Sequence, residues 1–319
     1  MTDLIFPLAL VLALLIDRLW GEPPVRLHPV VWMGNYLAWA GKRVQAVTLP
    51  AGLDDFKVFW LAALYWIAGA ALITGVTWVL QSLIQGLWIG LSVLFLALLL
   101  KPLLAWAMLK SEVLAVEAAL GQSLPAGRER LSWLVSRDTT QLSESEVRES
   151  AIESLAENLS DSVVAPIFWF LLLGLPGAAL YRFANTADAM WGYKGVYKGQ
   201  NWEWAGKWAA RADDVLNWIP ARLTGVLLAA WHHVPLRQLR AQACQTPSPN
   251  SGWPMAAMAL ALNVRLGKPG VYTLNPAGHA PQAAQLPLAI VYASNMLLAL
   301  LFIVFIATVL IFFLKGAGG

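Results

Sequence analysis

Residues 288–314 read LAIVYASNMLLALLFIVFIATVLIFFL, and this run decides the fold class. It contains no charged residue, and it is longer than the roughly 20 apolar residues that a helix needs to cross a bilayer. Lys315 follows it directly. Two further apolar runs of spanning length, 58–80 and 87–109, are joined by a short turn without charges. Together these runs predict a chain that crosses a membrane several times as α-helices.

The beginning of the chain adds a shorter apolar run, residues 4–16. We expect this helix to extend to Trp20, with Asp17 and Arg18 near one membrane interface. No basic segment precedes the run and no small-residue cleavage site follows it, so it does not resemble a signal peptide. The predicted spanning helices are therefore 4–20, 58–80, 87–109 and 288–314.

The composition favours the same fold class. Of the 319 residues, 58% are hydrophobic and 13% are charged, whereas a soluble domain has about 45–50% apolar and about 25% charged residues. The net charge is +3 and the basic residues are scattered, which excludes a nucleic-acid-binding stripe. The single cysteine, Cys244, excludes an intramolecular disulfide framework and a cysteine-based metal cage. We predict an all-α polytopic membrane protein with one membrane domain, residues 1–319, because no repeat or linker divides the chain.

Residues 163–184 are apolar but interrupted. Gly174, Pro176 and Gly177 lie in the middle, where proline and glycine break a helix. Each remaining arm has about ten residues, too few to span a bilayer. The segment therefore favours a re-entrant hairpin over a straight span. Residues 215–234, interrupted by Pro220 and Arg222, are a possible membrane-associated segment on the same grounds.

The distribution of basic residues predicts the orientation. Basic residues mark the cytoplasmic side of a membrane protein, and here they gather in three stretches, 18–57, 110–162 and 182–240. All three can share one side only if 163–184 enters the membrane and returns. We expect an outside N-terminus, a location in the cell inner membrane, and a cytoplasmic face that includes an acidic helical region at 136–162.

The acidic region carries the first candidate site. Ser143 and Glu146 match a capping box, which predicts a helix start. Four carboxylates then follow at intervals of four residues, which places them on one helix face: Glu149, Glu153, Glu157 and Asp161. Few basic residues face this row, so a divalent cation or a cationic substrate group could offset the repulsion. The alternative is a solvated acidic helix face.

A second polar cluster follows the predicted hairpin. If residues 182–188 are helical, Arg182, Asn185 and Asp188 share a face. The hairpin would bring this cluster close to Glu157 and Asp161. The alternative is a set of buried hydrogen-bonding residues that pack the hairpin.

Other candidates are individually weaker. Lys194 and Lys198 lie in the glycine-rich stretch 192–199, which suits a phosphate cradle or an interfacial loop. Arg211, Asp214 and Arg222 lie among tryptophans that suit an aromatic belt or a pocket for a planar ligand; alternatively, the arginines pair with Asp213 or Asp214. The remaining candidates are Arg137 and Asp138 in a short polar stretch, Asn158 on the acidic helix, and His28 in a proline-rich turn.

The motifs together resemble the adenosylcobinamide-phosphate synthase family of cobalamin biosynthesis (the CbiB/CobD family). The resemblance runs in the family's order from near the start of the chain past its middle, and the region after about residue 240 departs from it. The matching stretches are DRLWGEPPVRLHPVVWMG (17–34), SRDT (136–139), ESLAENLSDSVVAPIFW (153–169), RFANTADAMWGYK (182–194) and RADDVLNWIPARL (211–223).

The resemblance implies an amide-forming ligase. Its substrates would be (R)-1-amino-2-propanol phosphate and a propionate carboxylate of adenosylcobyric acid, with ATP and Mg²⁺ as the expected drivers. Implied metal ligands are Glu153, Glu157, Asp161 and Asp188. Implied catalytic residues are Asp138, Asp214 and Glu157. Implied substrate and phosphate contacts are Arg137, Arg182, Asn185, Lys194, Lys198, Arg211, Arg222, Asn158 and His28.

Two other functional classes stay open at this point. A membrane transferase could use paired carboxylates and Mg²⁺ on a lipid or prenyl substrate. The second class comprises proteins without enzymatic activity: a sensor of the related ampicillin-resistance family, or a transporter. The expected partners are the lipid bilayer, the corrinoid and aminopropanol phosphate substrates, other late cobalamin-pathway membrane enzymes and a second copy of the chain, with no nucleic acid.

Overall fold

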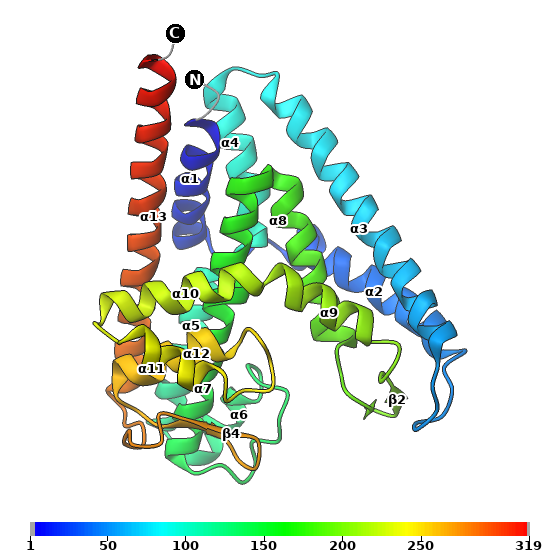
Figure 1. The fold of residues 1–319 in the computed structure, drawn as a ribbon, viewed down its shortest axis with the longest axis vertical. Helices are drawn as coiled ribbons and strands as arrows, with labels where there is room; N and C mark the ends of the chain where they lie inside the picture. The colour runs from blue at the N-terminus through cyan, green and yellow to red at the C-terminus, as the bar shows by residue number, and fades with distance from the viewer. Residues whose placement is uncertain (1–3, 318–319) are drawn as a thin grey trace. The chain divides into compact units, whose positions relative to one another are not determined.

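The computed structural model describes residues 4–317 and confirms the all-α prediction (Figure 1). Within that range, the β-structure consists of two antiparallel two-stranded ribbons and an isolated bridge between Val264 and His279. One pairs β1 (Val196–Tyr197) with β2 (Gln200–Asn201), and the other pairs β3 (Leu266–Lys268) with β4 (Tyr272–Leu274). All other regular structure is helical.

The chain forms two compact units, each built from two separate stretches of sequence. The first unit contains the chain up to Leu104 and residues Ala165–Asn217; the second contains Ala105–Val164 and the chain from Trp218 onward. Because both units are discontinuous, no linker in the sequence marks their boundary. Each unit is described by itself below.

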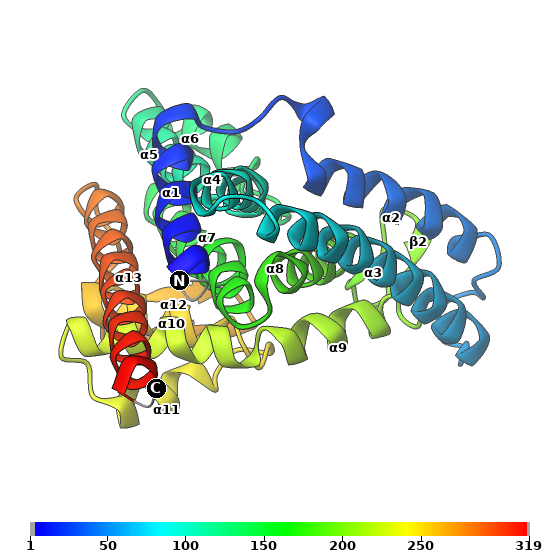
Figure 2. The ribbon, with the colours of Figure 1, turned by 90° about the horizontal axis from the view of Figure 1, so that it is seen from above.

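The first unit is a bundle of six α-helices and two short 3₁₀ turns. The elements are α1 (Ile5–Trp20), η2 (Val25–Leu27), α2 (Pro29–Gln45), α3 (Phe56–Gln85), α4 (Ile89–Leu100), η3 (Lys101–Leu103), α8 (Ala165–Trp191) and α9 (Lys207–Leu216). Helix α8 packs against α3, α2 and α9, as the two views in Figures 1 and 2 agree.

The second unit surrounds helix α7. Its elements are α5 (Trp106–Leu120), α6 (Leu124–Leu131), α7 (Glu144–Leu159), the π-helical turn η4 (Ser160–Val164), α10 (Trp218–Trp231), α11 (Leu236–Ala243), α12 (Gly252–Leu262) and α13 (Gln285–Ala317). Helices α5, α6, α12 and α13 all pack against α7. As a result, every residue from Val147 to Ala156 is buried, and the alternative of a solvated acidic helix is wrong.

Four helical stretches are long and apolar enough to cross a membrane: Phe56–Gln85, Ile89–Leu120, Glu144–Trp191 and Gln285–Leu314. Three of them contain or overlap the predicted spans at 58–80, 87–109 and 288–314. The predicted span at 4–20 corresponds to α1, whose 16 residues are fewer than the roughly 20 that a span needs. The fourth stretch of spanning length instead contains the segment 163–184. The chain is a polytopic membrane protein.

Helix α8 reverses direction at Gly174, inside the segment for which the sequence predicts a hairpin (Figure 1). Gly174 has φ 72° and ψ −158°, a conformation that side chains with a Cβ rarely adopt. The next backbone N–H, of Leu175, donates to Oε1 of Gln81 on α3 at 2.7 Å. The turn is thus held by α3 within the first unit. Entry of this hairpin into the bilayer stays a prediction.

Replacing Gly174 by alanine is expected to destabilise the first unit by about 1–3 kcal/mol, because φ must stay positive. A Cβ at this position would also clash with Oε1 of Gln81. The matched control is Gly75→Ala on α3, where a Cβ meets nothing within 4 Å. Thermal unfolding of both proteins in detergent checks the prediction, and equal midpoints would contradict it.

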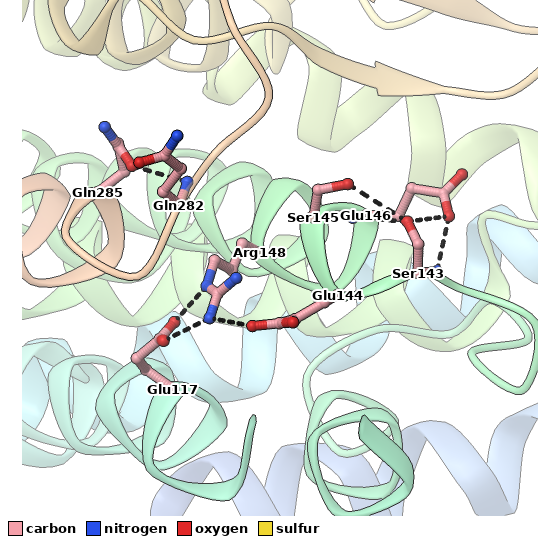
Figure 3. A network of polar contacts seen from close by, with 8 residues as sticks. All are labelled: Glu117, Ser143, Glu144, Ser145, Glu146, Arg148, Gln282 and Gln285. Carbon is pink, nitrogen blue, oxygen red and sulfur yellow. Dashed lines mark hydrogen bonds and ion pairs between the residues drawn. The ribbon is translucent and has the colours of Figure 1, made fainter. Parts of the chain in front are cut away.

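Two polar networks fix the N-terminal end of α7 in the second unit (Figure 3). The predicted capping box is confirmed, since Ser143 Oγ accepts from the N–H of Glu146 and the Glu146 carboxylate accepts from the N–H of Ser143 at 2.7 Å. Arg148 donates to both oxygens of Glu117 on α5 at 2.8 Å and to Glu144 at 2.6 Å. These contacts bind α7 to α5 and set the rotation of α7 about its axis.

Candidate active site in the second unit

A polar cavity of about 350 Å³ opens beside α7 in the second unit. Its wall on α7 consists of residues at helical spacing: Ser150, Glu153, Ser154, Glu157 and Asn158. The loop after α6 adds Ser136 and Arg137, the loop before α12 adds Thr246 to Ser248 and Ser251, and the β3–β4 ribbon adds Lys268 and Tyr272. Four of the candidates predicted from the sequence, Arg137, Glu153, Glu157 and Asn158, therefore meet in one cavity.

Glu153 is the central residue of this cavity wall. Its side chain is 4% exposed, and Arg137 donates to Oε2 at 2.5 Å while the Tyr272 hydroxyl donates to Oε1 at 2.8 Å. A buried carboxylate needs such partners, since an unpaired buried charge is expensive. The prediction that few basic residues face the acidic row is wrong: Arg137 comes from a loop that its sequence position does not place near α7.

The loop that carries Arg137 is anchored to α6. Thr139 is buried, and its Oγ1 donates to the carbonyl oxygen of Arg128 at 3.0 Å. Arg128 Nε in turn donates to the carbonyl oxygen of Leu142 at 2.6 Å. These bonds anchor the part of the loop that follows Arg137 to α6.

The β3–β4 ribbon supplies the opposite wall. Lys268 pairs directly with Tyr272 across the ribbon, and directly opposed residues of a strand pair share a face. The buried Asn275 at the end of the ribbon donates through Nδ2 to the carbonyl oxygens of Ala259 and Val264, at 3.3 and 3.1 Å. These bonds fix the ribbon to the end of α12, and β3 packs against α7.

Burial and the negative charges of Glu153 and Glu157 raise the pKa of Tyr272 far above its ordinary value. The phenol therefore keeps its proton at neutral pH. It acts as a hydrogen-bond donor to Glu153. The cationic side chains that line the cavity are those of Arg137 and Lys268.

Replacing Tyr272 by phenylalanine is expected to lower turnover roughly tenfold, because the loss of one hydrogen bond to a charged partner costs on the order of 1.5–3 kcal/mol. The matched control is Tyr292→Phe on α13, whose ring stacks on His232 at 3.6 Å and does not line the cavity. Turnover of each variant per folded protein is the measurement. A normal rate for the Tyr272 variant would remove this residue from the site.

The acidic row does not act as one cluster. Four-residue steps along an α-helix advance by about 40°, so three steps wrap the row around α7. Asp161 lies beyond α7 in the π-helical turn η4, which shifts its direction further. Of the row, Glu153 and Glu157 line the cavity. Glu149 does not line the cavity, and it lies 3.6 Å from Arg265.

The arrangement of these side chains restricts which of the predicted ligands could hold a metal ion. Within residues 4–317, no group of three or more His, Cys, Asp and Glu side chains is placed to hold a metal ion. Both oxygens of Glu153 are already engaged by Arg137 and Tyr272. Glu157 and Asn158 are the other cavity residues with oxygen ligands among those predicted. One carboxylate is enough for Mg²⁺ only when substrate phosphates supply further ligands.

Asp138 does not line the cavity with its neighbour Arg137. It is exposed, and its Oδ1 accepts from the N–H of Thr140 at 2.9 Å. This backbone hydrogen bond lowers the pKa of the Asp138 carboxyl, which makes the group a weaker base. The structure therefore favours a turn-forming role for Asp138 over its predicted role in proton transfer.

The other sequence candidates, Arg222 excepted, lie in the first unit. Asn185 donates to Asp213 at 3.4 Å and accepts from Arg182 at 3.5 Å, and the charges of Asp188 and Asp214 lie close enough to repel. Burial raises the pKa of Asp214, and the positive charge of Lys194 opposes this rise. This polar cluster fits the packing alternative, and its roles in catalysis and metal binding stay predictions.

The glycine-rich stretch 192–199 folds around a carboxylate of the protein itself. The N–H of Gly195 donates to Oε2 of Glu203 at 2.9 Å, so part of the predicted phosphate cradle is occupied. Lys198 has φ 48° in the turn between β1 and β2, and its Nζ lies 5.2 Å from the Tyr197 ring. Arg211 is exposed on α9.

His28 has a local electrostatic role in the first unit. Its Nε2 lies 3.3 Å from Oε2 of Glu22, and the same oxygen accepts from Lys101 Nζ at 2.8 Å. Lys101 also lies 3.5 Å from Asp17. This network joins the ends of α1 and α4 to the turn before α2 through Asp17, Glu22 and His28 of the 17–34 motif, and the role of His28 in substrate binding stays a prediction.

Sequence reasoning missed the residues that follow position 240. Lys268, Tyr272 and the loop at Thr246–Ser248 complete the cavity, although the resemblance did not extend to them. The one usable signal was composition: the hydroxyl-rich loop QTPSPNSGWP (245–254) and the tight turn around Gly270 interrupt an otherwise apolar region. Nothing in the sequence links Tyr272 to Glu153, 119 residues away.

Comparison with known proteins agrees with the resemblance of the motifs. The family model described as CobD/Cbib protein matches residues 10–313. A probable cobalamin biosynthesis protein CobD from Methanothermobacter thermautotrophicus is 43% identical over 278 residues, covering 83% of this chain and 85% of the relative. The cobalamin biosynthesis protein CobD from Chromobacterium violaceum is 43% identical over 267 residues, covering 82% and 81%.

A third relative extends the match further along the chain. A probable cobalamin biosynthesis protein CobD from Methanothrix thermoacetophila is 36% identical over 300 residues, with 90% of this chain and 92% of the relative covered. No solved structure matches the chain. The chain belongs to the CobD/Cbib protein family, and this membership places it in cobalamin biosynthesis.

Proposed function

We propose that the protein is an amide-forming ligase that joins (R)-1-amino-2-propanol phosphate to a propionate carboxylate of adenosylcobyric acid. The reaction consumes ATP, requires Mg²⁺ and yields adenosylcobinamide phosphate. Family membership supports the pathway. The observation that carries the proposal is the cavity of the second unit, which Arg137 and Lys268 line together with Glu153 and Glu157.

The chemistry of amide formation explains why such a cavity suits the reaction. A free carboxylate is a poor acyl donor, so one carboxylate oxygen first attacks the γ-phosphorus of ATP and ADP leaves. The amine nitrogen then attacks the acyl carbon of the acyl phosphate, the carbon–oxygen bond breaks, and phosphate leaves. The ammonium of the free amine must lose a proton before this attack, which requires a base.

The cavity residues divide into matching roles. Lys268 and Arg137 neutralise the charge on the phosphoryl oxygens, as cations do at phosphoryl-transfer sites. Glu157 accepts the proton of the ammonium, and Asn158 orients the acyl group through its side-chain amide. Glu153 is a positioning residue, because it holds Arg137 and Tyr272. A cavity of about 350 Å³ admits a propionate arm and a phosphate, with the corrinoid ring remaining outside it.

Mg²⁺ enters this proposal with the nucleotide. Magnesium sites commonly combine one or two carboxylates with substrate phosphates, and here the phosphates would supply most of the ligands, because Glu157 is assigned to accept the ammonium proton. The ion would supply charge neutralisation on the phosphates. Of the four implied ligands, Glu153 is engaged by Arg137 and Tyr272, and Asp161 and Asp188 do not line this cavity.

We also propose a location in the cell inner membrane with the cavity on the cytoplasmic side. Basic residues favour the cytoplasmic side, and the second unit carries several of them, of which Arg137 and Lys268 line the cavity: Arg128, Arg130, Arg137, Arg240, Arg265 and Lys268. ATP is a cytoplasmic substrate. Neighbouring enzymes of the same pathway and a second copy of the chain are proposed partners.

An isotope-transfer experiment tests the proposal. The protein, purified in mild detergent, receives adenosylcobyric acid labelled with ¹⁸O in its free propionate carboxylate, together with aminopropanol phosphate, ATP and Mg²⁺. The expected result is the amide product and ¹⁸O in the released inorganic phosphate. Label in AMP would instead indicate that the activated intermediate is an acyl adenylate.

Failure to form any amide, with the protein shown to be folded, would overturn the ligase. A mass shift in added lipid would then point to a lipid transferase. Ion flux in liposomes would point to a transporter.

A further inference from the structure

A second cavity of about 590 Å³ lies next to the first in the second unit. The two cavities share the wall formed by Thr246, Pro247 and Ser248. The far side of the second cavity is formed by aromatic and basic side chains from three helices: Trp218 and Arg222 of α10, Arg240 of α11 and Trp253 of α12. Its lining therefore differs in kind from that of the first cavity.

Arg222 is held in a fixed position within this cavity. Its Nη1 donates to the carbonyl oxygen of Trp218 at 2.7 Å and to Oδ1 of Asn250 at 3.1 Å, and its Nη2 donates to the carbonyl oxygen of Pro249 at 3.2 Å. A guanidinium has five N–H donors, so donors remain for a ligand. The guanidinium carbon lies 4.1 Å from the Trp218 ring centre and 5.1 Å from that of Trp253.

The charge of this cavity is unbalanced. Two arginines line it, and none of the described residues that form its wall is acidic. Burial lowers the pKa of Arg222, which means that its charge has lost solvation without gaining a carboxylate from the cavity wall. An anion in the cavity would compensate for the lost solvation of Arg222. The two indole rings add flat apolar surface, which suits an anion attached to a planar group.

We infer that this second cavity binds the adenine nucleotide, with its base against Trp218 and Trp253 and its phosphates on Arg222 and Arg240. The inference rests on the proposed function and adds the location of the nucleotide. From the second cavity, the terminal phosphate reaches the first cavity past the hydroxyls of Thr246 and Ser248. The carboxylate activated there meets the γ-phosphorus at the shared wall.

The test measures ATP binding directly, without the corrinoid. Equilibrium dialysis of the full-length protein in detergent with radiolabelled ATP and Mg²⁺ compares the wild type with Arg240→Ala. Arg240 is exposed, so this variant is expected to fold. The predicted result is a roughly tenfold weaker affinity, as the loss of one charged hydrogen bond implies. Trp253→Leu is a second variant with an expected loss of similar size.

The matched control is Arg237→Ala. Arg237 is exposed on the same helix α11, three residues earlier, and does not line the cavity. Its ATP affinity is expected to equal that of the wild type. Equal affinities for the Arg240 and Arg237 variants would overturn the inference, because they would leave the cavity without a role in nucleotide binding.

Competing ligands separate a nucleotide from other phosphate esters. ADP is expected to displace ATP at lower concentration than pyrophosphate, because the base contributes to binding. If anionic phospholipid micelles displaced ATP as effectively as ADP does, the cavity would be a site for lipid headgroups. That result would overturn the inference.

Turnover distinguishes failure of this inference from failure of the ligase. If the wild type forms the amide and Arg240→Ala keeps the wild-type KM for ATP, the nucleotide assignment is wrong and the ligase stands. If no amide forms but ATP binding depends on Arg240, the ligase is wrong and the nucleotide site stands.

Discussion

Replacing Glu157 by glutamine is expected to reduce the rate of amide formation at least about 100-fold, the usual contribution of a general base. Glutamine keeps the size and a hydrogen-bonding oxygen of the side chain but cannot accept the proton of the ammonium. Glu157 is half-buried on α7 and lines the cavity, so the protein is expected to fold normally. The effect should fall on kcat, measured by quantifying the corrinoid product by mass spectrometry.

The matched control for this change is Glu129→Gln. Glu129 is exposed on α6 in the same unit and does not line the cavity, so its removal tests the loss of one negative charge alone. Its turnover is expected to match that of the wild type. If the Glu157 variant were as active as the Glu129 variant, the proton acceptor would have to be sought elsewhere in the chain.

Replacing Arg148 by methionine is expected to destabilise the second unit by about 1.5–3 kcal/mol, because it removes the hydrogen bonds to the charged Glu117, whose side chain is 18% exposed. Arg148 is 7% exposed and makes three hydrogen bonds to Glu117 and Glu144 (Figure 3). Methionine retains much of the apolar stem but none of the donors. Equilibrium unfolding in mixed detergent micelles measures the change in free energy of unfolding.

Two further variants make this stability prediction specific. Arg237→Met removes an exposed arginine of the same unit and is expected to be nearly neutral. Adding Glu117→Gln to Arg148→Met should recover part of the lost stability, since the two residues interact directly and their effects are not additive. A stable Arg148→Met protein, or strict additivity in the double variant, would show that this network does not hold α7 in place.

Local signals in the sequence predicted the local structure well. The pairing of Ser143 with Glu146 marked the start of α7, and the capping box is present. Gly174, Pro176 and Gly177 indicated a break in the apolar segment, and the chain reverses at Gly174. Such features depend on a few neighbouring residues, so one sequence is enough to recognise them.

The burial of α7 was not predictable in the same way. The acidic helix has as many carboxylates as a surface helix, and its mean composition is polar. It is buried against α5, to whose Glu117 its own Arg148 donates, while Arg137 and Arg265 approach from other elements and pair with its carboxylates. Only the tertiary structure brings these arginines to α7, which is why a metal ion seemed necessary from the sequence alone.

The sequence predicted one wall of the candidate site but not the other. The α7 residues and Arg137 were recognised from residue type and from the family resemblance. The opposite wall, with Lys268 and Tyr272, comes from a short ribbon that Asn275 fixes to the end of α12. Contacts between residues more than a hundred positions apart leave no spacing pattern in a single sequence, so this half required the structure.

One measurement tests the central claim most directly: whether the purified chain itself forms the amide. The protein in mild detergent is incubated with adenosylcobyric acid, aminopropanol phosphate, ATP and Mg²⁺, and parallel mixtures each omit one component. The account predicts a corrinoid product with the mass of the amide adduct in the complete mixture and in none of the others. Absence of that product from the complete mixture, with folded protein that binds ATP, would contradict the account.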